Sequence, residues 1–200
     1  MEIDLTGEHK GAAYKILASL VTPRPIAWVT TNDIQGRINA APFSFFNVFG
    51  TQPPVVVIAP GDKDPGVPKD TARNIRDTGE FVINLVDDTV FESMVASAAT
   101  LPHGVEELAD SGLTYAESQA VTPPRIAEAP ASLECREQIT LRIGQNRLIV
   151  GEVLRVHARE GIFDPKTLRM NVSQYQPLGR MASPDWYTRT TDLFEFERQD

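Results

Sequence analysis

The sequence lacks several features that define large classes of protein. It has one cysteine, Cys135, among 200 residues, so it cannot form a disulfide within the chain or a metal site built from several thiolates. It has no apolar run of about 18–20 residues, which a membrane-spanning helix needs. The stretch ILASLV near the start is too short for a signal-peptide core. We therefore expect a cytoplasmic protein with no membrane partner.

An excess of positive charge is also lacking. The chain has 19 Lys and Arg against 27 Asp and Glu, which gives a formal net charge of −8. An acidic protein is poorly suited to bind a phosphate backbone or an anionic headgroup layer over a broad surface. We therefore expect no nucleic-acid partner, although a local basic pocket for a small anion is compatible with this balance.

Common catalytic and nucleotide-binding motifs are missing as well. Residues 61–66 have the GxxxxG spacing of a phosphate loop, but Val67 and Pro68 replace the Lys-Ser/Thr pair that such a loop needs. No GxGxxG opens a helix, Ser44 lacks a GxSxG context, and the histidines have no partners at metal-ligand spacing. We identify no catalytic residue and no metal site, so any enzymatic chemistry is expected to come from a bound cofactor.

The residues that are present predict one folded domain over residues 1–200. The composition is 42% hydrophobic and 23% charged, which is ordinary for a globular protein. Strand-like segments occur as hairpins, at residues 24–44 and 132–159, and as buried strands at 55–59 and 80–86. Hairpins without regular β–α–β alternation predict a mainly β (α+β) fold, a closed or nearly closed antiparallel barrel with helical insertions.

Helices are expected at three places between these strands. Residues 69–79 begin with Asp70 or Thr71 as a cap and end at a glycine, as helices often do. Residues 88–100 have apolar side chains at helical spacing, and a short helix is expected around residues 105–110.

The segment NAAPFSFFN (residues 39–47) has small side chains in its first half and aromatic ones in its second. Ala40 and Ala41 leave room for a flat ring against the main chain, whose N–H groups can bond the polar edge of that ring. Phe45 and Phe46 supply an apolar wall. The pattern therefore predicts a flat aromatic cofactor at this segment.

Lys69 and Thr71 lie at the first turn of the helix expected at residues 69–79. A cation, a hydroxyl group and unpaired helix N–H groups together suit a phosphomonoester. The alternative is a capped surface helix that carries an exposed lysine. On spacing alone, both interpretations stay open.

Several other chemically versatile residues are expected to be structural. His157 lies within a predicted strand, and Cys135 alternates with core residues as a buried thiol does. Trp186 and Tyr187 lie in a strand-like tail, where they either flank a pocket or pack the end of the chain.

Several motifs in order resemble the flavin reductase-like, FMN-binding split-barrel family. They are PRPIAWVTTNDIQGRINAAPFSFFN, KDTARNI, TGEFVINLV, PPRIAEAPASLEC, GEVLRVHAR and PLGR. The resemblance covers about residues 20–180. It implies a split β-barrel homodimer that binds FMN non-covalently at or near the subunit interface.

The resemblance also implies a set of cofactor-binding residues. They match segments that in the family lie against the flavin ring, form the turn after it, or hold the phosphate. They are Thr30, Thr31, Asn39, Ala40, Ala41, Ser44, Phe45, Phe46, Asn47, Lys69, Asp70 and Thr71. Ser44 to Asn47 are expected in the turn and Lys69 to Thr71 at the phosphate. Arg24 and Arg180 are further candidates for contact with an anion.

The function implied by the resemblance is an FMN-binding oxidoreductase. It takes a hydride from NADH or NADPH onto FMN and passes the electrons to a further acceptor. One alternative is a non-catalytic FMN-binding electron carrier or flavin store. Another is a flavoenzyme that oxidises a small organic substrate.

Overall fold

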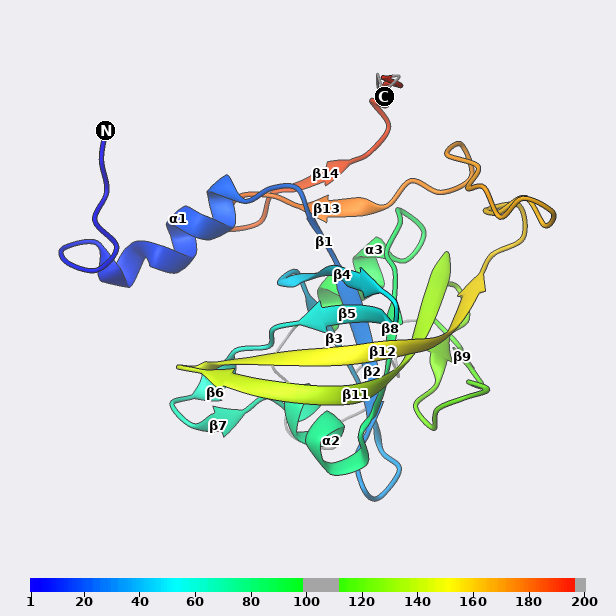
Figure 1. Ribbon diagram of the computed structural model, residues 1–200, viewed down its shortest axis with the longest axis horizontal. Coiled ribbons are helices and arrows are strands. Elements are labelled where there is room, and N and C mark those ends of the chain that lie inside the picture. The colour runs from blue at the N-terminus through cyan, green and yellow to red at the C-terminus, as the bar shows by residue number, and fades with distance from the viewer. Residues whose placement is uncertain (99–111, 197–200) are drawn as a thin grey trace.

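A single antiparallel sheet dominates the computed structural model, which describes residues 1–98 and 112–196 (Figure 1). Its seven strands run in the order β3-β2-β8-β11-β12-β5-β4. Three small sheets accompany it, of which β1-β13-β14 lies beside helix α1 at one end of the molecule (Figure 1). The mainly β fold with helical insertions that the sequence predicts is confirmed. That residues 1–200 form a single domain stays a prediction.

The strands of the large sheet are β2 (Ala27–Asn32), β3 (Ile38–Phe43), β4 (Phe46–Thr51), β5 (Pro54–Ile58), β8 (Glu80–Asn84), β11 (Ala131–Ile143) and β12 (Asn146–Ala158). The short strands are β1 (Arg24–Pro25), β6 (Asp62–Asp64), β7 (Val67–Pro68), β9 (Tyr115–Ala116), β10 (Arg125–Ile126), β13 (Leu178–Arg180) and β14 (Tyr187–Arg189). The helices are η1 (Lys10–Ala12), α1 (Ala13–Leu20), α2 (Asp70–Thr78) and α3 (Phe91–Ala96).

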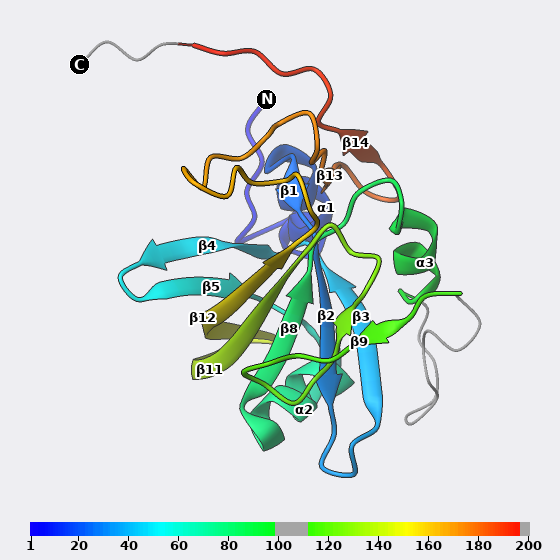
Figure 2. The same ribbon diagram turned by 90° about the vertical axis from the view of Figure 1, so that its right-hand side faces the viewer.

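The large sheet is buried on both faces near its β2 strand. Successive β2 residues contribute to different apolar clusters: Ala27 and Val29 pack with Phe81, whereas Trp28 packs with Met94. This distribution follows from the two-residue period of a strand. Helix α2 packs on β2 and β3, and it lies at the end of the sheet opposite α1 (Figure 2).

Both predicted hairpins form, as β2–β3 and β11–β12. The apolar face of β11 is buried along only part of the strand, because Cys135 is 0% exposed but Ile143 is 58% exposed. Two register shifts interrupt the β11–β12 pairing, and β8 pairs only with Ser132 to Arg136. The far half of β11 therefore extends past β8, and its apolar side chains are exposed.

Helix α2 confirms its predicted stop but not its predicted caps. Gly79 follows the helix with φ 74°, a left-handed conformation that glycine adopts without strain. The N-cap is Lys69, whose side chain makes no capping bond. Asp70 and Thr71 lie inside the first turn, where their side chains bond to other residues.

Within the helix expected at residues 88–100, the described residues are helical from Phe91 to Ala96. The helix expected around residues 105–110 lies outside the described residues. The tail forms only the three-residue strand β14 among its described residues.

The resemblance places Phe46 and Asn47 in a turn. In the structure they instead begin strand β4. They pair with Ile58 and Val57 of β5. A strand that starts this early places the β3–β4 turn at Ser44 and Phe45 alone.

Candidate functional site

Strands β2 and β3 and helix α2 bring several predicted residues together. Thr31 of β2 and Asn39 of β3 are paired directly. The Asn39 Nδ2 atom donates to Thr71 Oγ1 at 3.1 Å, and Asn74 Nδ2 donates to Thr31 Oγ1 at 3.0 Å. Thr71 is only 1% exposed. Its side chain therefore fixes the first turn of α2 against the sheet.

Lys69 gives this end of α2 a positive charge. Its side chain is exposed, and its Nζ atom lies 5.5 Å from the centre of the Phe43 ring. The neighbouring Asp70 carboxylate pairs instead with Lys63 at 2.6 Å and Arg73 at 3.1 Å. Lys69 forms no ion pair with any described residue, so its ammonium group and the positive end of the α2 dipole together suit an anion.

Thr30 and Ala40 belong to the opposite face of the β2–β3 pair, and both are 0% exposed. The Thr30 Oγ1 atom donates to the Pro124 carbonyl at 2.5 Å, and Ala40 packs in the cluster that contains Trp28. These two side chains therefore do not contact a ligand near α2 directly. They affect such a ligand only by fixing the position of strands β2 and β3.

The β3–β4 turn combines an aromatic ring with a guanidinium group. The Ser44 hydroxyl accepts a hydrogen bond from Arg24 Nε at 3.3 Å. The Phe45 ring is 6.1 Å from the Tyr14 ring and 6.0 Å from the guanidinium carbon of Arg24. Phe45 is 38% exposed, so it presents part of its ring to a ligand.

The remaining predicted residues flank this turn. Ala41 and Phe46 are half-buried and pack against the cluster that contains Val29. Asn47 is exposed, and its Oδ1 atom accepts the Val48 N–H at 2.8 Å.

A cavity of about 190 Å³ lies beside this turn. Its lining includes Tyr14, Ile26, Phe43, Met94 and Tyr187. Of these, only Tyr187 stood out in the sequence, because the others have the character of ordinary core residues. Phe43 both lines the cavity and lies beside the Lys69 ammonium group. The Phe43 ring therefore links the start of α2, where Lys69 lies, to this cavity.

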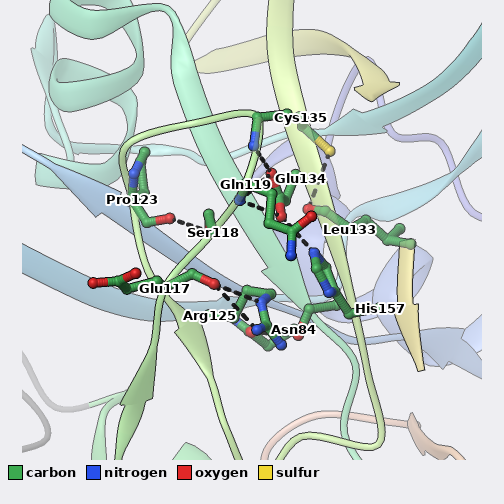
Figure 3. A network of polar contacts seen from close by, with 12 residues as sticks. Asn84, Glu117, Ser118, Gln119, Pro123, Arg125, Leu133, Glu134, Cys135 and His157 are labelled. Atoms are coloured by element: carbon green, nitrogen blue, oxygen red, sulfur yellow. Dashed lines mark hydrogen bonds and ion pairs between the residues drawn. The ribbon is translucent and has the colours of Figure 1, made fainter. Parts of the chain in front are cut away.

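The Glu134–His157 pair anchors a loop that includes Gln119 and Ala120 (Figure 3). Glu134 is 0% exposed, and its carboxylate accepts the Gln119 N–H at 2.9 Å, the Ala120 N–H at 2.5 Å and a 2.5 Å bond with His157 Nε2. Burial alone raises the pKa of Glu134, but the hydrogen bonds from the two N–H groups and His157 outweigh it and lower the pKa. The geometry agrees with a structural role for His157.

Replacing Glu134 with glutamine should lower the free energy of unfolding at pH 7 by about 2 kcal/mol, because charge-assisted bonds to a buried carboxylate are lost. The folded pKa of Glu134 is lower than its ordinary value of 4.5. Its contribution is therefore complete above that value and is lost as the pH falls through the folded pKa. Urea unfolding should show a difference between wild type and E134Q that shrinks as the pH falls from 7 to 3. A difference that stays constant would contradict this assignment. The exposed Glu160 offers the control E160Q.

Cys135 is a buried thiol, as predicted. Burial, and next the nearby Glu134 charge, raise the pKa of the thiol. The protonated form is a poor nucleophile, so Cys135 has no chemical role in this site.

Two features are absent from the described residues. These residues include no group of three or more His, Cys, Asp or Glu side chains placed to hold a metal ion. In the same part of the chain, no helix is long and apolar enough to cross a membrane.

Comparison with known families gives a match over residues 19–179 to the flavin reductase like domain. The chain belongs to this family. An uncharacterized protein of Deinococcus radiodurans is 42% identical to this flavin reductase-like protein over 200 residues, which cover 98% of this chain and 88% of the relative.

Solved structures share the fold. The crystal structure of the Pseudomonas fluorescens 2-nitrobenzoate 2-nitroreductase NbaA has a TM-score of 0.89 at 34% identity, covering all of this chain and 96% of the other. A putative flavin reductase with a split barrel domain from Shewanella frigidimarina has a TM-score of 0.82 at 17% identity and covers 100% of both chains. The split-barrel prediction is therefore confirmed. The family assignment supports a flavin cofactor and a flavin-dependent oxidoreductase.

Proposed function

We propose that this flavin reductase-like protein binds FMN and reduces it with NADH or NADPH. The observation that carries the proposal is the meeting of three features at one place. These are the Lys69 ammonium group at the start of α2, the β3 segment with its small alanine side chains, and the Phe43 ring, which lies beside Lys69 and lines the neighbouring cavity.

The residues present fit FMN in charge and shape. Lys69 has no ion-pair partner among the described residues and is available to the phosphate, together with the main chain of Asp70 and Thr71. Asn39 and Thr31 hold this turn of α2 in position through hydrogen bonds. Ala41, Ser44 and the partly exposed ring of Phe45 offer a surface for the flavin ring. Thr30, Ala40, Phe46 and Asn47 then support that surface from behind or from its edge.

When bound, FMN supplies the two-electron chemistry that no protein side chain here supplies. The protein's contribution is to hold donor and ring in contact, at about 3–3.5 Å between reacting atoms, and to exclude water. Cationic and N–H groups near the ring favour added negative charge. No described residue is assigned a proton-transfer step.

We also propose a homodimer with the flavin at or near the interface and a cytoplasmic location. Exposed apolar side chains on neighbouring parts of the large sheet support the dimer, since such surface commonly marks an interface. They are Val48, Phe49, Ile139, Leu141 and Ile143. Sedimentation of the purified protein at the mass of one 22.1 kDa chain would contradict the dimer.

A second candidate is a flavoenzyme that acts on a small organic molecule. The observation that favours it is the 34% identity to a 2-nitrobenzoate 2-nitroreductase over the whole chain. In that case the organic compound exchanges electrons with the flavin directly.

An anaerobic absorbance titration tests the proposal. The purified protein is loaded with FMN, and its spectrum is recorded before and after NADH and then NADPH are added. Bleaching of the flavin bands by either donor supports the reductase. Bands that persist with both donors contradict it and favour an electron carrier or flavin store. Bands bleached only by an organic reductant favour a flavoenzyme that oxidises such compounds.

A further inference from the structure

The described residues give the cavity beside the β3–β4 turn an aromatic and apolar lining and one charged side chain. Tyr14 of α1, Phe43 of β3, Met94 of α3 and Tyr187 of β14 are among its walls, and Arg180 of β13 is the charged residue. Its volume of about 190 Å³ is smaller than the roughly 300–1,000 Å³ typical of pockets for drug-sized ligands. The cavity therefore suits a molecule with a single ring.

Two arginines are paired in the backbone register at this place, and no buried carboxylate among the described residues forms an ion pair with either of them. Arg24 of β1 and Arg180 of β13 are direct partners in the strand register. Like charges in such positions are unfavourable, and buried charges are normally paired. An anion between or beside the two guanidinium groups would neutralise this excess positive charge.

Arg24 is already held in place by neutral acceptors. It is 7% exposed and donates to the carbonyl groups of Ala18, Val21 and Met181. No described carboxylate pairs with it. Burial, and to a smaller extent the nearby Arg180 charge, lower its pKa, which the Tyr14 hydroxyl partly offsets. Arg24 therefore adds positive charge to the region but has its donors engaged.

Arg180 has a donor to spare. Its Nη2 atom donates to the Pro184 carbonyl, and its only carboxylate neighbour among the described residues is Asp185, at 3.6 Å and with a side chain 86% exposed. Its Nη1 atom is shielded from solvent and has no hydrogen-bond partner in the described chain. The guanidinium carbon lies 4.5 Å from the centre of the Tyr187 ring. The contact with Tyr187 places the guanidinium group at the wall of the cavity.

We infer that this cavity binds a small aromatic carboxylate, with the ring among the aromatic side chains and the carboxylate on Arg180. The planar guanidinium group matches a carboxylate in geometry and charge. The ligand supplies the acceptor that Nη1 lacks once the guanidinium turns toward it. Because the cavity adjoins the proposed flavin site through Phe43, the bound compound is placed to exchange electrons with the flavin. That role rests on the proposed function, whereas the binding itself does not.

Calorimetric titration of the full-length, FMN-loaded protein with benzoate and with benzamide tests the inference. These probes have the same ring, and only benzoate is an anion. Benzoate should bind at least about tenfold more tightly than the neutral amide, as expected for a charge-assisted bond. R180Q should reduce that preference to less than about twofold, while R180K should retain part of it. Arg189, an exposed arginine of β14 that pairs with Asp88, provides the control R189Q, which should bind benzoate like wild type.

Three outcomes would overturn the inference. The first is equal binding of benzoate and benzamide by the wild-type protein, or no binding of either. The second is an R180Q variant that is folded by circular dichroism and keeps the full preference for benzoate. The third is an R180Q variant that loses affinity for FMN but not for riboflavin, which would assign Arg180 to the flavin phosphate. Repeating the titration without nicotinamide donors keeps the result independent of the reductase activity.

Discussion

Replacing Lys69 with methionine is expected to weaken FMN binding by about 10- to 100-fold. This range corresponds to the loss of one charge-assisted hydrogen bond to a phosphate. Lys69 is exposed at the N-cap of α2 and has no ion-pair partner among the described residues, so its ammonium group reaches a ligand without breaking an ion pair. Methionine keeps an unbranched apolar stem against Phe43. Quenching of FMN fluorescence during titration gives the dissociation constant.

The matched control for this variant is K166M, since Lys166 is also exposed but lies in the segment between β12 and β13. Riboflavin, which lacks the phosphate, should bind K69M and wild type with similar affinity. If K69M binds FMN as tightly as K166M does, the start of α2 is not the phosphate site. Thr71 is a poor choice for the same test, because it is buried and its loss would leave the Asn39 amide without its partner.

Replacing Gly151 with alanine is expected to lower the free energy of unfolding by about 2–3 kcal/mol, as overpacking of a dense core does. A Cβ atom at this position would lie 2.4 Å from Phe81 Cζ and 2.8 Å from Phe81 Cε1. Phe81 is 0% exposed and belongs to the cluster that also contains Cys135. Its ring therefore has no free space into which it can move. Urea denaturation at pH 7 measures the change.

Gly61 provides the control for this prediction. A Cβ atom there would meet its nearest neighbour, Asn146 Oδ1, at 3.8 Å, so G61A should leave stability nearly unchanged. The double variant G151A/F81L should lose less stability than the sum of its single variants, because leucine relieves the clash. Strict additivity would indicate that Phe81 is not the residue that excludes the side chain.

Much of the fold was predictable because local signals and burial agree. The β2–β3 hairpin is marked by a turn sequence between two strand-like segments, and Gly79 marks the end of α2. The exposed half of β11 was not predictable, because Ile139, Leu141 and Ile143 alternate in the sequence as buried residues do. The neighbouring strands determine where the burial of β11 side chains ends. How far β11 extends past a neighbouring strand cannot be determined from the sequence of β11 itself.

The candidate site was predictable where the chain is locally unusual. Ala41 stood out by its small size and Lys69 by its charge. The structure places Lys69 at the start of α2 and Ala41 on β3, the strand beside that helix. The cavity was not predictable, because Tyr14, Ile26 and Met94 come from distant segments that only the fold brings together. The same holds for the facing pair Arg24 and Arg180, which are 156 residues apart and meet through the β1–β13 register.

The most direct test of the account is an equilibrium titration of the wild-type protein with FMN and with riboflavin, followed by flavin fluorescence. A flavin site with its phosphate at Lys69 and the start of α2 predicts that FMN binds at least about tenfold more tightly than riboflavin. Equal affinities would contradict the phosphate site, and no binding of either flavin would contradict the central claim that this protein acts through FMN.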